Sequence, residues 1–149
     1  RGNVPTRLEK LQNGDFDAIL LAAAGLSRLN LDLSGFHVVQ FNPKEFIPAP
    51  AQGVLAFQTA ADNLEVRRIL KQIHHSEVSA ITNVERKVLK LMEGGCHMPL
   101  GVYCERDEQG NYHVWAAMAD TWDAPLKRAR LSSSTSFNLA EQIVELLKS

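Results

Sequence analysis

The stretch "HMPLGVYCERDEQGNYHVWAAMA", residues 97–119, indicates which fold the last part of this chain takes. Two apolar-rich runs, residues 97–106 and 112–119, flank "DEQGN", which is typical of the turn in a β-hairpin. The run "LKRARLS", residues 126–132, predicts a third strand. Together these segments predict a small antiparallel sheet of three strands.

Helices are predicted before and after this sheet. After Ser76, apolar residues recur every three or four positions and form one buried stripe: Val78, Ile81, Val84, Val88 and Met92. We expect Gly94 and Gly95 to stop this helix. The run "SFNLAEQIVELLK", residues 136–148, predicts a closing amphipathic helix with Ser136 as its cap. Its inward residues are Leu139, Ile143, Leu146 and Leu147. A sheet covered by helices is an α+β unit.

The first third of the chain predicts a different kind of fold. Asn3 is a candidate helix cap, with Pro5 in the first turn and Gly14 just past the end. The apolar run "FDAILLAAAG", residues 16–25, predicts a buried strand, and "FHVVQF", residues 36–41, a second one. This order of elements is typical of an α/β layer fold.

A proline-rich segment, "NPKEFIPAPAQG", residues 42–53, predicts an extended connection between these parts. After it, "VLAFQ", residues 54–58, predicts a strand, and "DNLEVRRILKQI", residues 62–73, a helix that starts at a capping residue. The chain therefore reads as two substructures joined by a long extended segment.

The composition excludes some classes of protein. The formal net charge of the 149 residues is -1, which argues against a general nucleic-acid binder. No apolar run approaches the ~20 residues of a membrane-spanning helix, and no signal peptide is visible. Two cysteines are too few for a disulfide framework, so we expect a reducing cytoplasm. Because the chain opens with "RGNVPTR" and no initiator methionine, we expect a fragment of something longer.

Cys96, in "LMEGGCHMPLG", is the first candidate site residue. Free cysteine is among the most buried residue types, which favours a packing role. The two preceding glycines and the following proline instead favour a reachable loop. A helix C-terminus opposes thiolate formation, so Cys96 is a poor protease-type nucleophile. A single reaction with a strong electrophile stays open.

A metal site from His74, His75, Cys96 and His97 is a weak alternative, because the spacing fits no standard zinc pattern. Cys104 lies mid-strand, where packing or surface exposure is the expected role.

Three arginines, Arg1, Arg7 and Arg28, lie near glycines and element ends. Solvated surface positions are the usual fate of arginine. The functional alternative is capture of carboxylates, which the guanidinium fork binds bidentately. Local amides freed at glycines and helix starts would assist such binding.

Three motifs in order resemble one family, porphobilinogen deaminase, also called hydroxymethylbilane synthase. The run "RGNVPTRLEKLQNGDFDAILLAAAGLSRL" resembles its second domain, and "IPAPAQGVLAFQ" resembles its return crossover to the first domain. The run "HHSEVSAITNVERKVLKLMEGGCHMPLG" resembles the start of its third domain. The resemblance covers essentially the whole chain.

The resemblance implies a role for particular residues. Cys96 matches the cysteine that holds a dipyrromethane cofactor by a thioether. Arg1, Arg7 and Arg28 match arginines that bind acetate and propionate groups of the cofactor and the growing pyrrole chain. Ala22, Gly25 and Gln52 match positions that line the cleft near these pyrroles. No metal is implied.

The resemblance also implies an activity and a domain plan. The family condenses four porphobilinogen units head to tail, with loss of ammonia, into hydroxymethylbilane for haem biosynthesis. Residues 1–46 would be the remainder of a periplasmic-binding-protein-like α/β domain. Residues 47–73 would belong to the first domain, and residues 74–149 would form the C-terminal cofactor-attachment domain.

The resemblance places the catalytic aspartate before Arg1, in a missing N-terminal domain, so we expect this chain alone to lack turnover. The intact enzyme would be a monomer without nucleic-acid or membrane partners, whereas the fragment would expose apolar surface and self-associate. The rival interpretation is a non-catalytic binding module for anionic tetrapyrroles or polycarboxylates.

Small departures from the family pattern occur in the crossover and around the cysteine. Ala51 stands where glycine is usual, and Gln58 where glutamate is frequent. The residues "HMPL" after Cys96 are also less usual. These changes leave open how the crossover packs.

Overall fold

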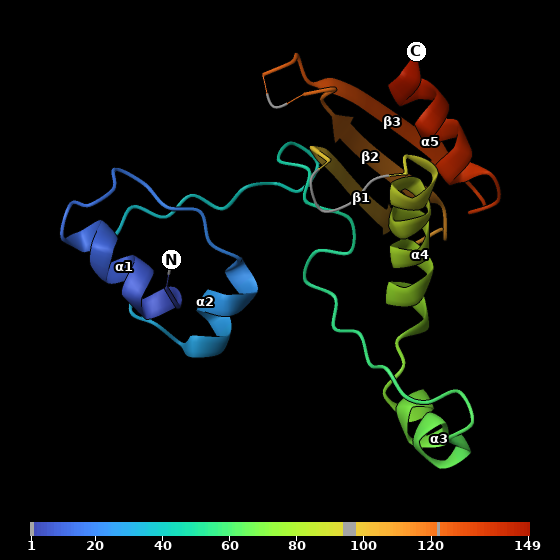
Figure 1. The fold of residues 1–149 in the computed structure, drawn as a ribbon, viewed down its shortest axis with the longest axis horizontal. Coiled ribbons are helices and arrows are strands. Elements are labelled where there is room, and N and C mark those ends of the chain that lie inside the picture. Colours follow the sequence, from blue (N-terminus) through green and yellow to red (C-terminus); the bar gives the residue numbers. More distant parts are fainter. Residues whose placement is uncertain (1, 94–97, 122) are drawn as a thin grey trace. The chain divides into compact units, whose positions relative to one another are not determined.

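The structure is a computed structural model that describes residues 2–93, 98–121 and 123–149 (Figure 1). The chain divides into two compact units, Arg1–Phe41 and Asn42–Ser149. Each unit is described by itself below.

The N-terminal unit contains two short helices, α1 (Val4–Gln12) and α2 (Ala23–Leu29). The Asn3 side chain caps α1 as predicted, since its Oδ1 accepts the Thr6 N–H at 3.0 Å. Gly14 follows the helix with a φ of +79°, a left-handed conformation that favours glycine.

The two strands predicted in this unit are wrong. Residues 16–22 are irregular, residues 23–25 already belong to α2, and residues 36–41 form no strand. A strand needs a neighbouring backbone to satisfy its N–H and C=O groups, and none is paired with these runs in the described part of the unit. Several of their apolar side chains, Phe16 and Val39 among them, are more than half exposed.

The C-terminal unit contains the predicted three-stranded antiparallel sheet. Its strands are β1 (Leu100–Arg106), β2 (Tyr112–Met118) and β3 (Lys127–Ser133), in the order β1-β2-β3. The register pairs Cys104 with Val114 and Val114 with Leu131. Because side chains alternate between the faces of a sheet, this row points toward the core.

Two helices, α4 (Ser76–Leu91) and α5 (Leu139–Lys148), cover one face of this sheet (Figure 1). Helix α4 packs against β1, and α5 packs against β2 and β3. The core comprises Val84, Val88, Met92, Leu100, Val102, Cys104, Val114, Ala116, Met118, Leu139, Ala140, Ile143, Val144 and Leu147. The α+β prediction is therefore confirmed for this unit.

The ends of the two helices differ in detail from the prediction. Helix α4 ends at Leu91, and Glu93 takes the left-handed conformation (φ 53°) that glycine usually supplies. The predicted stop residues, Gly94 and Gly95, lie outside the described residues. Ser136 is not the cap of α5: the helix starts after Asn138, whose φ of 53° turns the chain without a side-chain cap.

The segment before α4 has two parts. Residues Asn42–Gly53, here named the strap, run without regular structure beside β1, where the Pro48 carbonyl accepts the Val102 N–H at 2.9 Å. The strand predicted over residues 54–58 is absent, because no backbone pairs with it in the described residues. Helix α3 (Leu64–Gln72) follows, and Asn63 Oδ1 caps it by accepting the Val66 N–H at 3.1 Å.

Candidate functional site

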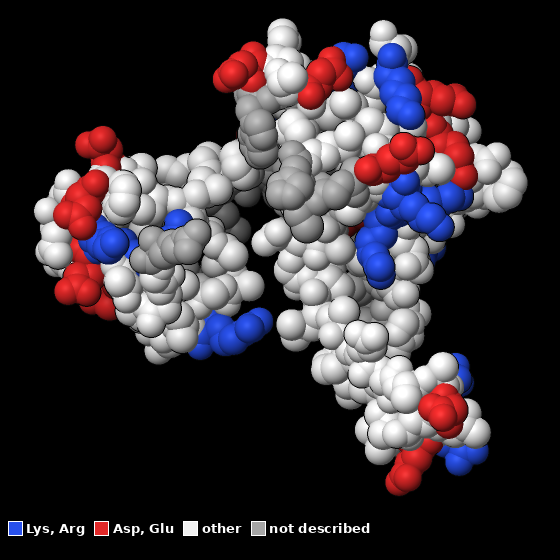
Figure 2. Space-filling view, in the orientation of Figure 1, with Lys and Arg blue, Asp and Glu red and all other residues white. Residues whose placement is uncertain are grey.

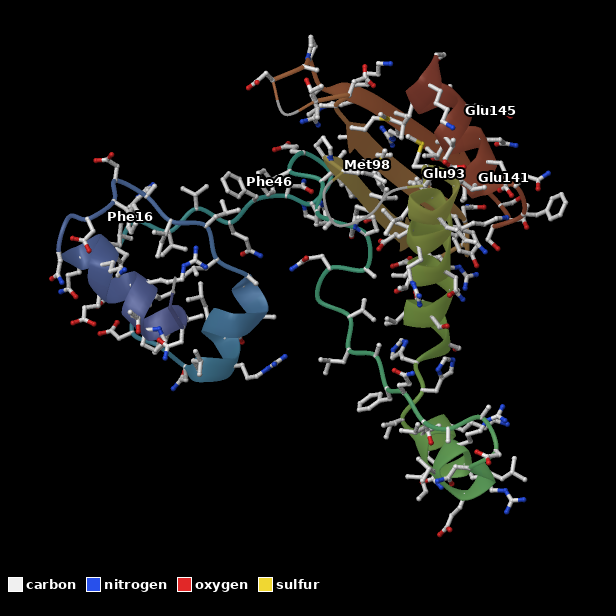
Figure 3. All side chains as sticks on the ribbon, in the orientation of Figure 1. Phe16, Phe46, Glu93, Met98, Glu141 and Glu145 are labelled. Atoms are coloured by element: carbon white, nitrogen blue, oxygen red, sulfur yellow. The ribbon has the colours of Figure 1, made fainter. Side chains whose placement is uncertain are left out.

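Arg7 lies on α1 and faces a hollow of about 410 Å³ in the N-terminal unit. Its Nη2 donates to the Leu20 carbonyl at 3.2 Å, which holds the guanidinium beside the loop before α2. Lys10 also lines the hollow, and no carboxylate does so among its described lining residues. Phe16, labelled in Figure 3, and Ile19 supply apolar surface. The hollow therefore offers cations and apolar contacts to an anionic ligand.

The other predicted residues of this unit lie on or beside α2. Ala22 is the residue before the helix, and no side chain caps its first turn. Gly25 lies within α2 near α1, because a Cβ added there would meet Val4 Cγ2 at 3.8 Å. Arg28 is exposed in the last turn and does not line the hollow. The structure thus brings Arg7 to a hollow but leaves Arg28 apart from it.

Gln52 is exposed at the end of the strap, in a turn where its N–H donates to the Ala49 carbonyl at 3.0 Å. Ala51, one residue earlier, has a φ of 60°. This left-handed conformation gives a physical reason for the glycine that is usual at this position in the resembled family.

Cys96 and Arg1 lie outside the described residues, as does His97. Glu93 and Met98, both labelled in Figure 3, are the described residues that flank the Cys96 segment. Glu93 lies two residues after the end of α4, and Met98 precedes β1 and packs against the core. In the order of the chain, Cys96 therefore falls between α4 and β1.

Glu85 is a residue that the sequence interpretation missed. It is only 7% exposed, and its carboxylate accepts two backbone N–H groups, from Cys104 to Oε1 at 2.8 Å and from Ala51 to Oε2 at 2.7 Å. Burial raises the pKa of Glu85, and the two hydrogen bonds oppose that rise. A signal was present, since Glu85 lies on the apolar stripe of α4 together with Ile81 and Val88.

Cys104 is fully buried in the core, which fits the predicted packing role. Burial, together with the charges of Glu85 and Glu105, raises the pKa of its thiol to about 12. A thiol in this state is neutral near pH 7 and unreactive.

His74 and His75 line a second hollow, of about 470 Å³, with Arg86 and the extended residues Val54–Phe57. The His75 Nδ1 accepts the Val78 N–H at 3.3 Å and so caps α4. Among the described residues no group of three or more histidine, cysteine or acidic side chains is placed to hold a metal ion. Two members of the weak metal hypothesis, Cys96 and His97, lie outside the described residues.

A polar network closes the β1–β2 hairpin. His113 Nε2 lies 3.0 Å from Asp107 Oδ2, and its Nδ1 lies 2.7 Å from the Ser132 hydroxyl. Hydrogen bonds from Asn111 and His113 lower the pKa of Asp107 to about 2. These contacts join the turn to β2 and β3, so we assign them a structural role.

The wider surface shows no large region of one charge on the face drawn in Figure 2, where acidic and basic side chains are intermixed. None of the helices in the described ranges has the length and apolar character needed to cross a bilayer. The geometry thus defines a general class: a unit with a hollow lined by two cationic side chains, followed in the chain by an α+β domain.

Comparison with known proteins narrows this class. Residues 1–68 match the family model described as porphobilinogen deaminase, dipyromethane cofactor binding domain. Residues 80–120 match the model described as porphobilinogen deaminase, C-terminal domain. The two matches follow each other along the chain and together take up most of it.

Relatives with the name porphobilinogen deaminase agree with these matches. The protein of Fusobacterium nucleatum is 45% identical over 106 residues, which are 70% of this chain and 35% of that protein. The protein of Chloroherpeton thalassium is 35% identical over 145 residues, 96% of this chain and 45% of that protein. This chain therefore belongs to the porphobilinogen deaminase family, and it spans less than half the length of these relatives.

Proposed function

We propose that this chain is part of a transferase that joins four porphobilinogen units head to tail, with loss of one ammonia for each unit. Hydrolysis by one water molecule then releases the product, hydroxymethylbilane. The observation that carries the proposal is the order of the two family matches, a cofactor-binding domain followed by a C-terminal domain. The hollow beside Arg7 supports it, because each pyrrole unit carries two carboxylates that need cationic partners.

The residues present fit a dipyrromethane cofactor. Arg7 and Lys10 suit its carboxylates, and Phe16 and Ile19 suit the apolar faces of its rings. In this proposal Cys96 holds the cofactor covalently, Arg1, Arg7 and Arg28 bind carboxylates, and Ala22, Gly25 and Gln52 line the cleft. When bound, the cofactor supplies the primer on which the pyrrole chain is built. Among the described members of this set, only Arg7 lines the hollow. The roles of the others, Cys96, Arg1, Arg28, Ala22, Gly25 and Gln52, rest on the family resemblance.

The remaining features of the proposal concern the parent protein. Residues 1–46 would complete a periplasmic-binding-protein-like α/β domain, and residues 47–73 would pack on a further N-terminal part that bears the catalytic aspartate. Exposed apolar side chains support this, since Leu55 is 72% and Phe57 64% exposed. The 149-residue chain alone would lack turnover and would self-associate through this surface. A cytoplasmic location fits a soluble substrate.

Mass spectrometry of the protein expressed from the complete reading frame tests the attachment. We expect a dipyrromethane adduct that maps to the peptide with Cys96. The adduct should disappear in Cys96→Ser and persist in Cys104→Ala, the matched control for the buried thiol. An adduct on the Cys96→Ser protein would refute the assignment.

Calorimetry on the 149-residue chain tests the anion site. Biliverdin, a stable linear tetrapyrrole with two propionates, is the probe. If Arg7 binds carboxylates, Arg7→Ala should weaken binding by about tenfold or more, as expected for loss of a charged hydrogen bond, and Lys71→Ala on α3 should not. Tight binding that ignores Arg7→Ala would refute the arginine role. If this chain binds biliverdin tightly and the complete protein carries no dipyrromethane adduct, the results would favour the rival interpretation, a non-catalytic binding module.

A further inference from the structure

The strap and α4 both contact the edge of the sheet that is formed by β1. Strand β1 pairs only with β2 in the described sheet, so its other edge has backbone donors left over. Val102 and Cys104 are two residues apart, and their N–H groups therefore point to the same edge. Val102 donates to the Pro48 carbonyl at 2.9 Å, and Cys104 donates to Glu85 Oε1 at 2.8 Å.

Glu85 links this edge to the strap. Its second oxygen, Oε2, accepts the Ala51 N–H at 2.7 Å. Both oxygens of a nearly buried carboxylate are thus bonded to main-chain donors, and no ion pair of Glu85 occurs in the described ranges. Backbone donors of two segments, 53 residues apart, are held by one side chain.

Close packing fixes the strap at a second point. A Cβ at Gly101 would come within 2.5 Å of the Ile47 carbonyl oxygen, so only glycine allows this approach. Lys44 adds contacts on the outer face, where its Nζ lies 2.7 Å from Glu105 Oε1 and 4.9 Å from the centre of the Trp115 ring. The strap therefore has a defined seat on the C-terminal unit.

We propose that Glu85 is a positioning residue, which ties the Ala51–Gln52 turn to helix α4 so that Gln52 and the end of α4 before Cys96 keep a fixed relation. The proposal rests on the proposed function for the roles of Gln52 and Cys96. Glu85 lies in the middle of α4, and the helix ends at Leu91, five residues before Cys96. A shift of this helix would thus be transmitted to the Gln52 turn through one side chain.

The chemistry of the site requires a carboxylate of this length. Glutamine has the same shape but only one acceptor oxygen, so it satisfies one of the two N–H groups. Alanine satisfies neither, and it leaves the buried Cys104 N–H without a partner. Different substitutions therefore predict different patterns of loss at Ala51 and Cys104.

Amide hydrogen exchange by NMR on the 149-residue chain reads these two N–H groups directly. We expect the Ala51 and Cys104 amides to exchange at least about tenfold faster in Glu85→Ala, since a charged hydrogen bond contributes at least the tenfold equivalent. In Glu85→Gln only one of the two should do so. Glu145→Gln, on an exposed face of α5 (Figure 3), is the matched control and should change neither. Unchanged exchange at Ala51 in both Glu85 variants would overturn the proposal.

A second variant guards against general unfolding in Glu85→Ala. Gly101→Ala displaces the strap at Ile47 and leaves the carboxylate in place. We expect the Ala51 amide to lose protection while the Cys104 amide keeps it. Equal loss at both amides would show that the strap has no separate docking step and would contradict the proposal.

A test of the functional role measures kcat in a double-mutant cycle, with the protein from the complete reading frame. If Glu85 acts through the turn, Glu85→Gln combined with Gln52→Ala should lower kcat no further than Gln52→Ala alone. Multiplied effects would overturn the positioning role even if both amides respond. A protein without porphobilinogen turnover would overturn the proposed function instead, and the amide data would then stand alone.

Discussion

At the scale of single residues, Ala51 carries a conformational cost that its neighbours do not. The left-handed conformation costs a non-glycine residue about 1–2 kcal/mol, and the greater freedom of unfolded glycine offsets about 0.4–1 kcal/mol of that. We therefore expect Ala51→Gly to raise the free energy of unfolding by about 0.5–1 kcal/mol in urea titrations. Ala80→Gly, inside α4, should lower it by about 1 kcal/mol. Equal losses for both would contradict the strained backbone.

Glu85 predicts a pH dependence of stability whose sign follows from its raised pKa. Between the ordinary value of 4.5 and the raised value, the folded chain binds more protons than the unfolded chain. The free energy of unfolding should therefore fall as the pH rises through this window. The neighbouring Tyr103 and the Cys104 thiol, both with raised pKa values, stay neutral there and add no slope.

The measurement for Glu85 is a comparison with Glu85→Gln over the same pH range. Asp107 and Glu141 have lowered pKa values and give the opposite slope at more acidic pH, so the difference between the two proteins isolates Glu85. The difference in unfolding free energy should change with pH only inside the window. A constant difference would show that the carboxyl ionises as it does in water.

The sequence alone led to part of this residue-scale structure. Asn3 and its helix were predictable, because a cap and its helix lie within a few residues of each other. The apolar stripe of α4 could have indicated that Glu85 is buried. Its hydrogen bonds were not predictable, because the partners, Ala51 and Cys104, are 34 and 19 residues away and donate from the backbone. The departure at Ala51 was visible in the sequence, but only the φ angle explains it.

At the scale of elements, the same substitution should have very different effects on α5 and α3. Ile143 is fully buried between α5 and the sheet, whereas Ile69 on α3 is 55% exposed. Ile143→Ala should lower the free energy of unfolding by about 2–5 kcal/mol, because it removes apolar burial and leaves a cavity. Ile69→Ala should change it by less than about 0.5 kcal/mol. Similar losses in urea titrations would mean that α3 also belongs to the core.

The success of the strand predictions depended on where the pairing partner lies. Strands β1 and β2 were predictable because the Asp107–Asn111 turn brings each next to its partner. The runs at residues 16–25, 36–41 and 54–58 have strand-like composition but no paired backbone in the described chain. Strand propensity describes how well a residue fits a sheet, and it does not supply the sheet.

At the scale of the whole molecule, burial is concentrated in one part of the chain. All described residues that are buried lie between Thr82 and Leu147. Family motifs in the sequence predicted which protein the segments belong to. They did not predict that residues 2–41 and 54–73 lack a buried side chain here, because a family motif identifies a segment and does not show what packs against it.

This uneven core predicts two levels of stability within one chain. Amides of β1, β2 and the buried turns of α4 and α5 should exchange only through global unfolding, because opening them exposes the core. Amides of α1, α2 and α3 should exchange orders of magnitude faster, since helices of seven to nine residues without burial are marginal in water. Hydrogen exchange with mass spectrometry reads both sets in one experiment.

A shortened chain of residues 42–149 supplies the control, and its core amides should keep their exchange rates. Slow exchange in α1 or α2 that is lost together with the core would show that the two units fold as one.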